Sequence, residues 1–91
     1  MNFQSLNYFI MLAREKNFTR AAEKLHLTQQ TLSANVAALE KEWGMKFLIR
    51  HVPLELTDAG KVFYAYALQF TSGEEALSRT LKDIANEEAG N

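Results

Sequence analysis

The sequence predicts a small, mainly α-helical fold: three helices and a two-stranded hairpin, followed by one long helix. Three observations predict it. Two stretches with helical spacing of apolar residues are separated only by His26 and Leu27. A short apolar segment then follows a glycine and reaches the chain's single proline. The last third carries apolar residues every three or four positions. Because so short a connection forces a sharp angle between two helices, the stretch 17–42 is predicted to be a helix-turn-helix.

The composition suits one small domain. The chain has 91 residues, a hydrophobic content of 47% and no cysteine, so it can pack a core but cannot form a disulfide or a thiolate metal site. No apolar run approaches the roughly 20 residues that span a bilayer. No basic segment followed by an apolar segment marks a secretory leader. We therefore expect a cytoplasmic protein that does not contact a membrane.

The net charge of −1 hides a division between the two halves of the chain. Residues 1–50 contain seven basic and four acidic side chains, which gives +3, whereas residues 51–91 contain three basic and seven acidic ones, which gives −4. A basic half that carries the helix-turn-helix is typical of a nucleic-acid-binding module. Because phosphate contacts supply much of the affinity for DNA, this modest excess predicts weak binding by a single copy.

The first predicted helix covers roughly residues 5–16, with Ser5 as a candidate N-cap and an apolar stripe that packs behind the helix-turn-helix. The second predicted helix follows Asn17, a good N-cap. Thr19 and Arg20 open this helix, where the helix dipole favours anions. Thr19 therefore either contacts a phosphate or only helps to cap the helix.

The next predicted helix begins after Thr28, another good N-cap, and its apolar stripe consists of Leu32, Val36, Leu39 and Trp43. The N-terminal end of its other face is slim, polar and uncharged, with Gln29, Gln30, Thr31 and Ser33. Such a surface can enter a major groove and form hydrogen bonds with base edges. An ordinary solvated helix face is the alternative interpretation.

A two-stranded hairpin is predicted after Gly44, which suits the end of the preceding helix. Residues 45–50 are rich in strand-forming residues, residues 51–53 form a turn around Pro53, and residues 54–57 alternate like a return strand. Arg50 places a cation at the mouth of this hairpin, which would be the wing of a winged helix-turn-helix.

The last predicted helix covers residues 59–88, with Thr57 or Asp58 as its N-cap. Gly73 should cost roughly 1 kcal/mol relative to alanine, which predicts either a bend or a close approach by a neighbour. We expect the first third of this helix to pack on its own domain and the part beyond Phe70 to extend past it. The spacing of three and four is kept by Phe63, Tyr66, Phe70, Gly73, Leu77, Thr80 and Ile84.

The sequence resembles the N-terminal DNA-binding domain of the LysR-type transcriptional regulators. The resemblance extends from the N-terminus through Gly60, with the family's spacing almost intact. The matching residues are Leu6, Phe9, Phe18, Thr19, Ala21, Ala22, Leu25, Thr28, Gln29, Leu32, Ser33, Leu39, Glu40, Gly44, Phe47, Leu48, Arg50, Leu56, Thr57, Ala59 and Gly60.

This resemblance implies a winged helix-turn-helix DNA-binding domain at residues 1–58 and a linker helix at 59–88 that pairs antiparallel with its copy in a homodimer. Such a dimer would bind an inverted repeat in double-stranded DNA. The predicted DNA-binding residues are Thr19, Arg20, Thr28, Gln29, Gln30, Thr31, Ser33 and Arg50. The predicted dimerisation residues are Phe63, Tyr66, Phe70, Leu77 and Ile84.

Family members continue into an effector-binding domain that is absent from this chain, so a small-molecule effector would bind outside it. We expect a fragment rather than a natural truncation. The chain departs from the family where Gln30 replaces a frequent proline, where Ala34 replaces a long polar residue, and in a wing with few basic residues. These departures motivate an alternative, a helical dimerisation module that does not bind DNA. We expect neither an enzyme nor a cofactor or metal site, because the sequence offers no recognisable catalytic set or phosphate loop.

Overall fold

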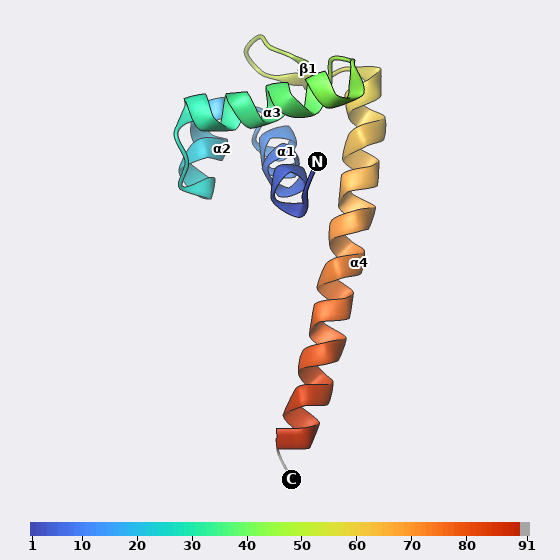
Figure 1. Cartoon of the computed structure of the whole chain (residues 1–91). Helices are drawn as coiled ribbons and strands as arrows, with labels where there is room; N and C mark the ends of the chain where they lie inside the picture. Colours follow the sequence, from blue (N-terminus) through green and yellow to red (C-terminus); the bar gives the residue numbers. More distant parts are fainter. Residues whose placement is uncertain (90–91) are drawn as a thin grey trace.

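The computed structural model describes residues 1–89, and within them three helices and a hairpin precede one long helix (Figure 1). Helix α3 lies across α1 and α2, while α4 extends away from them, so that the chain measures 55 × 25 × 20 Å. The elements are α1 Phe3–Glu15, α2 Phe18–Leu25, α3 Gln29–Trp43, β1 Leu48–Ile49, β2 Glu55–Leu56 and α4 Asp58–Ala89. None of these helices is long and apolar enough to cross a bilayer.

Each of the first three helices begins with a side-chain cap: a side-chain oxygen of the capping residue accepts the backbone amide three residues later. The caps of Asn17, at 2.9 Å, and Thr28, at 3.1 Å, confirm the predictions for α2 and α3. The prediction of Ser5 as the cap of α1 is wrong. Asn2 accepts the Ser5 amide at 2.8 Å, so Phe3 is already helical and Ser5 lies inside the first turn.

The core lies where α1, α3, the hairpin and the first turns of α4 meet. Phe9, Phe47 and Phe63 form its aromatic centre, with the Phe47 and Phe63 rings stacked at 4.5 Å between centroids and Phe9 edge-on to Phe63 at 5.2 Å. Phe63 is only 7% exposed. Its assignment to a dimer surface is therefore corrected: Phe63 packs inside its own chain.

The predicted apolar stripe of α3 is buried only through Leu39. Trp43 is 52% exposed, because the last turn of α3 extends beyond α1 and α2 (Figure 1). Gly44 ends α3 at φ 66°, as predicted.

The wing is shorter than predicted. Only Leu48 and Ile49 pair with Leu56 and Glu55, in antiparallel register. Phe47 turns its side chain into the core. Its carbonyl still accepts the Thr57 amide of the return strand, but its own amide donates to a side chain of α3. The predicted strands at 45–50 and 54–57 were therefore too long at both ends.

Thr57, not Asp58, caps α4, since its Oγ1 accepts the Gly60 amide at 3.0 Å. Gly60 itself is buried against the base of the wing. A Cβ atom there would collide with the carbonyl oxygen of Phe47, which accepts the Thr57 amide. Only glycine lets α4 begin this close to the wing.

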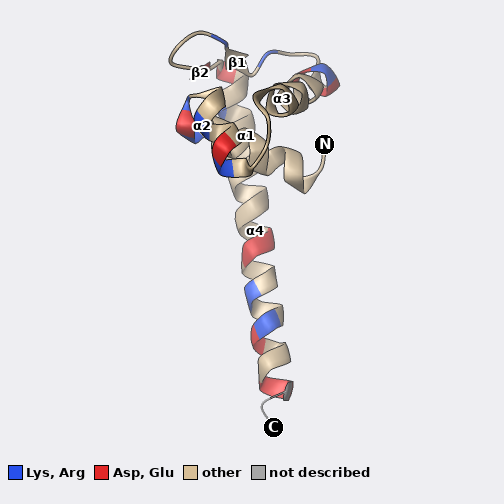
Figure 2. Cartoon of the chain, turned by 90° about the vertical axis from the view of Figure 1, so that its left-hand side faces the viewer, with Lys and Arg blue, Asp and Glu red and all other residues tan. Residues whose placement is uncertain are grey.

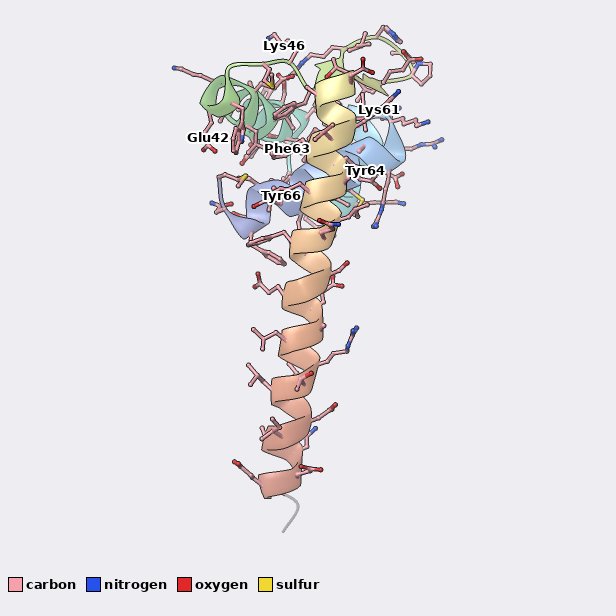
Figure 3. The ribbon with its side chains drawn as sticks, turned by 90° about the vertical axis from the view of Figure 1, so that its right-hand side faces the viewer. Glu42, Lys46, Lys61, Phe63, Tyr64 and Tyr66 are labelled. Carbon is pink, nitrogen blue, oxygen red and sulfur yellow. The ribbon has the colours of Figure 1, made fainter. Side chains whose placement is uncertain are left out.

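Helix α4 has two parts that differ in their surroundings. Through Thr71 it places Phe63, Ala67 and Thr71 against the other elements, whereas residues 72–88 are all exposed. Figure 3 shows the side chains of this second part projecting without a neighbouring ribbon. We call residues 1–71 the head and residues 72–89 the stem.

Candidate nucleic-acid interface

The N-terminal turns of α3 present the polar face that the sequence predicted. Gln29, Gln30 and Thr31 are exposed, and Ser33 is half-buried beside them. Each glutamine amide carries both donors and an acceptor, so it can recognise a base edge that offers either. Thr28 holds this end of the helix in place, because its Oγ1 accepts the Thr31 amide and donates to the Thr31 hydroxyl at 2.9 Å. The Thr31 hydroxyl therefore keeps its own hydrogen to donate in another direction.

Arg50 links the wing to α3. Its Nη1 donates to Ser33 Oγ at 3.0 Å and its Nη2 donates to Glu40 Oε1 at 3.2 Å. The Phe18 ring, at the start of α2, lies 5.3 Å from the guanidinium carbon. The arginine is thus held at the junction of α2, α3 and the wing.

Glu40 is the residue of this site that sequence reasoning missed. It is 4% exposed, and its Oε2 accepts the amides of Phe47 and Leu48 at 2.8 and 3.3 Å. The signal was present in the spacing: Glu40 stands at i+4 and i+8 from Val36 and Leu32, on the edge of the buried stripe. A carboxylate at such a position needs partners, and here it has three donors.

The structure brings three of the predicted residues to one concave surface. A depression of about 240 Å³ is lined from the start of α2, the start of α3 and the wing, with Thr19, Gln29 and Arg50 on its walls. Lys16 and His51 add two further basic side chains to it. Arg20 is exposed one residue beyond Thr19 in the first turn of α2.

A separate apolar surface runs along α4. Tyr66, Phe70, Leu77 and Ile84 are 44–58% exposed, as their predicted role requires. At the head the surface widens into a groove of about 480 Å³, and Figure 3 shows Phe63 and Tyr66 on the α4 face toward α3. Sequence reasoning missed four exposed residues of this surface: Trp43, Met45, Val62 and Leu81. The spacing could have identified two of them, because Val62 and Leu81 lie four residues from the predicted Tyr66 and Leu77.

Two helices joined by a three-residue turn, a third helix behind them and a two-stranded hairpin define a winged helix-turn-helix. Comparison with known proteins identifies the family within this structural class. The family model described as "Bacterial regulatory helix-turn-helix protein, lysR family" matches residues 3–61. The chain belongs to this family.

Its relatives are transcriptional regulators. The chain is 39% identical over 85 residues to the probable cat1 operon transcriptional activator of Acinetobacter lwoffii, covering 92% of this chain and 28% of that protein. It is 47% identical over 64 residues to the regulator CatR of Pseudomonas putida, covering 70% of this chain and 22% of that protein. The chain thus spans about a quarter of the length of these relatives.

Solved structures match over nearly the whole chain. A complex of the BenM DNA-binding domain with catB site 1 DNA superposes with a TM-score of 0.89 at 36% identity, covering 93% of this chain and 97% of that chain. A CbnR DNA-binding domain in complex with DNA gives 0.85 at 31% identity, covering 93% and 99%. Full-length BenM gives 0.84 at 34% identity, covering 90% of this chain and 27% of that chain.

Proposed function

We propose that this chain is the DNA-binding and dimerisation module of a bacterial transcription regulator. The observation that carries the proposal is the exposed polar start of α3 beside Thr19 and Arg50 on one concave surface. The similar BenM and CbnR domains, which are solved in complexes with DNA, support it. Helix α3 would enter the major groove of duplex DNA.

The side chains divide into two tasks. Gln29, Gln30, Thr31 and Ser33 contact base edges, which specifies sequence. Thr19 and Arg20 contact the backbone at the positive end of α2, and Arg50 contacts it from the wing. Thr28 contributes by holding the first turn of α3 in place, through its hydrogen bonds with Thr31.

A second copy of the chain covers the apolar surface of α4. The last turn of α4 has no basic residue and carries Glu87 and Glu88, which oppose the dipole of their own helix. Figure 2 shows acidic positions near both ends of the stem, with basic positions between them. An antiparallel pair places these carboxylates beside the positive N-terminal end of the partner helix, whereas a parallel pair places them beside each other. Two copies related by a two-fold axis present two α3 helices to an inverted repeat.

The test is a titration with a duplex that carries an inverted repeat and with a random duplex, each at several salt concentrations. Affinity for both should fall as salt rises, with a slope that counts the phosphate contacts. Gln29→Ala should weaken binding to the specific duplex by about 1–3 kcal/mol and leave random binding unchanged. Gln4→Ala is the matched control, because Gln4 is an exposed glutamine of α1. Equal behaviour of the two variants would show that α3 does not recognise the bases.

The alternative is a dimerisation module that does not bind DNA. Two features favour it: the charge of −4 on residues 51–91 and the small side chain of Ala34. It predicts a dimer in light scattering that binds neither duplex even at low salt. That result would replace the DNA-binding proposal.

A further inference from the structure

We propose that Glu40 is a positioning residue of the DNA interface: it fixes Arg50 so that the backbone contact of the wing and the contacts of Ser33 form as one unit. This inference rests on the proposed DNA binding. It concerns which residues act together, and it predicts that their substitutions are not additive.

Backbone amides hold the Glu40 side chain in position. Its side chain is 4% exposed, and Oε2 receives the amides of Phe47 and Leu48, just where the chain enters β1. A buried carboxylate needs such donors, because burying its charge without them is costly. The other oxygen, Oε1, faces Arg50 at 3.2 Å. The start of the wing therefore determines where the guanidinium lies.

Arg50 can bind an anion without leaving Glu40. A guanidinium has five N–H donors, and two of these are taken by Glu40 and Ser33. The remaining donors belong to a side chain that is 36% exposed and lies at the depression shared with Thr19 and Gln29. Because contacts with Glu40, Ser33 and the Phe18 ring already order this arginine, binding a phosphate loses little further rotamer freedom.

Ser33 is coupled to the same group. Its Oγ accepts from Arg50 Nη1 at 3.0 Å, so the hydroxyl hydrogen is free to donate in another direction. Moving Arg50 therefore changes the orientation of a hydroxyl on α3. The wing contact of Arg50 and the α3 contact of Ser33 therefore belong to one hydrogen-bonded chain.

The experiment is a double-mutant cycle of Glu40→Gln and Arg50→Ala, read out as affinity for a short random-sequence duplex against salt concentration, with thermal melting of each variant. Arg50→Ala should weaken binding about tenfold at low salt and reduce the salt slope by about 0.9, the value of one phosphate contact. Glu40→Gln should give most of this loss, and the double variant should be no weaker than Arg50→Ala. If the two losses multiply, or if Glu40→Gln lowers the melting temperature but leaves the salt slope unchanged, Glu40 is merely structural and the inference is wrong.

A second cycle keeps the test decisive if Glu40→Gln does not fold. Ser33→Ala removes one hydroxyl from a half-buried position and should preserve the fold. Measured on the duplex that carries the inverted repeat, it should weaken binding about threefold when Arg50 is present and have no effect in the Arg50→Ala background. Equal effects in both backgrounds would overturn the coupling. If the unmodified chain binds no duplex, the proposed function itself fails, which is a different outcome from additive losses in a chain that binds.

Discussion

The head and the stem contain the same kind of apolar spacing with opposite consequences. Phe63 and Ala67 lie in the head and are buried among α1, α3 and the wing, whereas Leu77 and Ile84 continue the spacing in the stem and are exposed. One helix carries both sets without interruption. An apolar stripe therefore defines a face of the helix, while the neighbouring elements decide whether that face is core or docking surface.

The largest effect that tests this difference between head and stem comes from truncating one large side chain in each part. Phe63→Ala should lower the free energy of unfolding by about 3–5 kcal/mol, because it removes the ring that stacks on Phe47. Leu77→Ala should change it by less than about 0.5 kcal/mol in protein dilute enough to be monomeric. Urea unfolding monitored by circular dichroism measures both. Similar losses would show that the stem folds back onto the head.

Gly60, in the head, gives the next largest effect. Gly60→Ala should destabilise the chain by more than about 2 kcal/mol, because its new methyl group meets the Phe47 carbonyl and forces α4 away from the wing. Calorimetric melting measures the change. A melting temperature equal to that of the unmodified chain would mean that the start of α4 is less closely packed than described.

Pairing through the stem should respond to a charge on its apolar face. Leu81→Asp buries a carboxylate from each copy and should weaken dimerisation at least about tenfold. Ser72→Asp adds the same charge to an exposed position about 180° away around the helix from Leu81, and should leave the dimer intact. Sedimentation equilibrium of the two variants compares them directly. Equal weakening by both would indicate that only net charge matters.

The smallest effect is expected at Gly73, with the opposite sign to Gly60. A methyl group there meets nothing within 4 Å, so Gly73→Ala should stabilise the monomeric helix by about 1 kcal/mol. Circular dichroism of dilute protein measures the gain. If the same variant also weakens pairing, the partner helix approaches closely at Gly73; if pairing is unchanged, the two helices cross elsewhere.

Local signals predicted most of the head. Asn17 and Thr28 cap their helices because a short polar side chain can reach an amide one turn ahead. The same rule selected Ser5 wrongly, since Asn2 stands three residues before it and can cap an earlier start. Where two candidates lie one turn apart, the sequence does not separate them.

Tertiary contacts decided the rest. Residues 45–47 have strand-like composition, yet the buried Glu40 carboxylate takes the Phe47 amide. Phe47 therefore keeps only its carbonyl bond with Thr57, and β1 is limited to two residues. The predicted DNA-binding residues of α3 are exposed or half-buried at the surface, because helical spacing fixes the direction in which each side chain projects. The bonds of Arg50 to Ser33 and Glu40 cross 17 and 10 positions, a separation that no local pattern reports.

Trp43, which departs from the core at the end of α3, gives the chain an optical property. It is the single tryptophan of the sequence, is 52% exposed, and lines the apolar groove with its ring 6.4 Å from that of Phe63. Indole emits at longer wavelengths in water than in an apolar setting. If a second copy covers the groove, the fluorescence of the unmodified chain should shift to shorter wavelengths as its concentration rises. The emission of Trp43 then measures how much of the groove is covered.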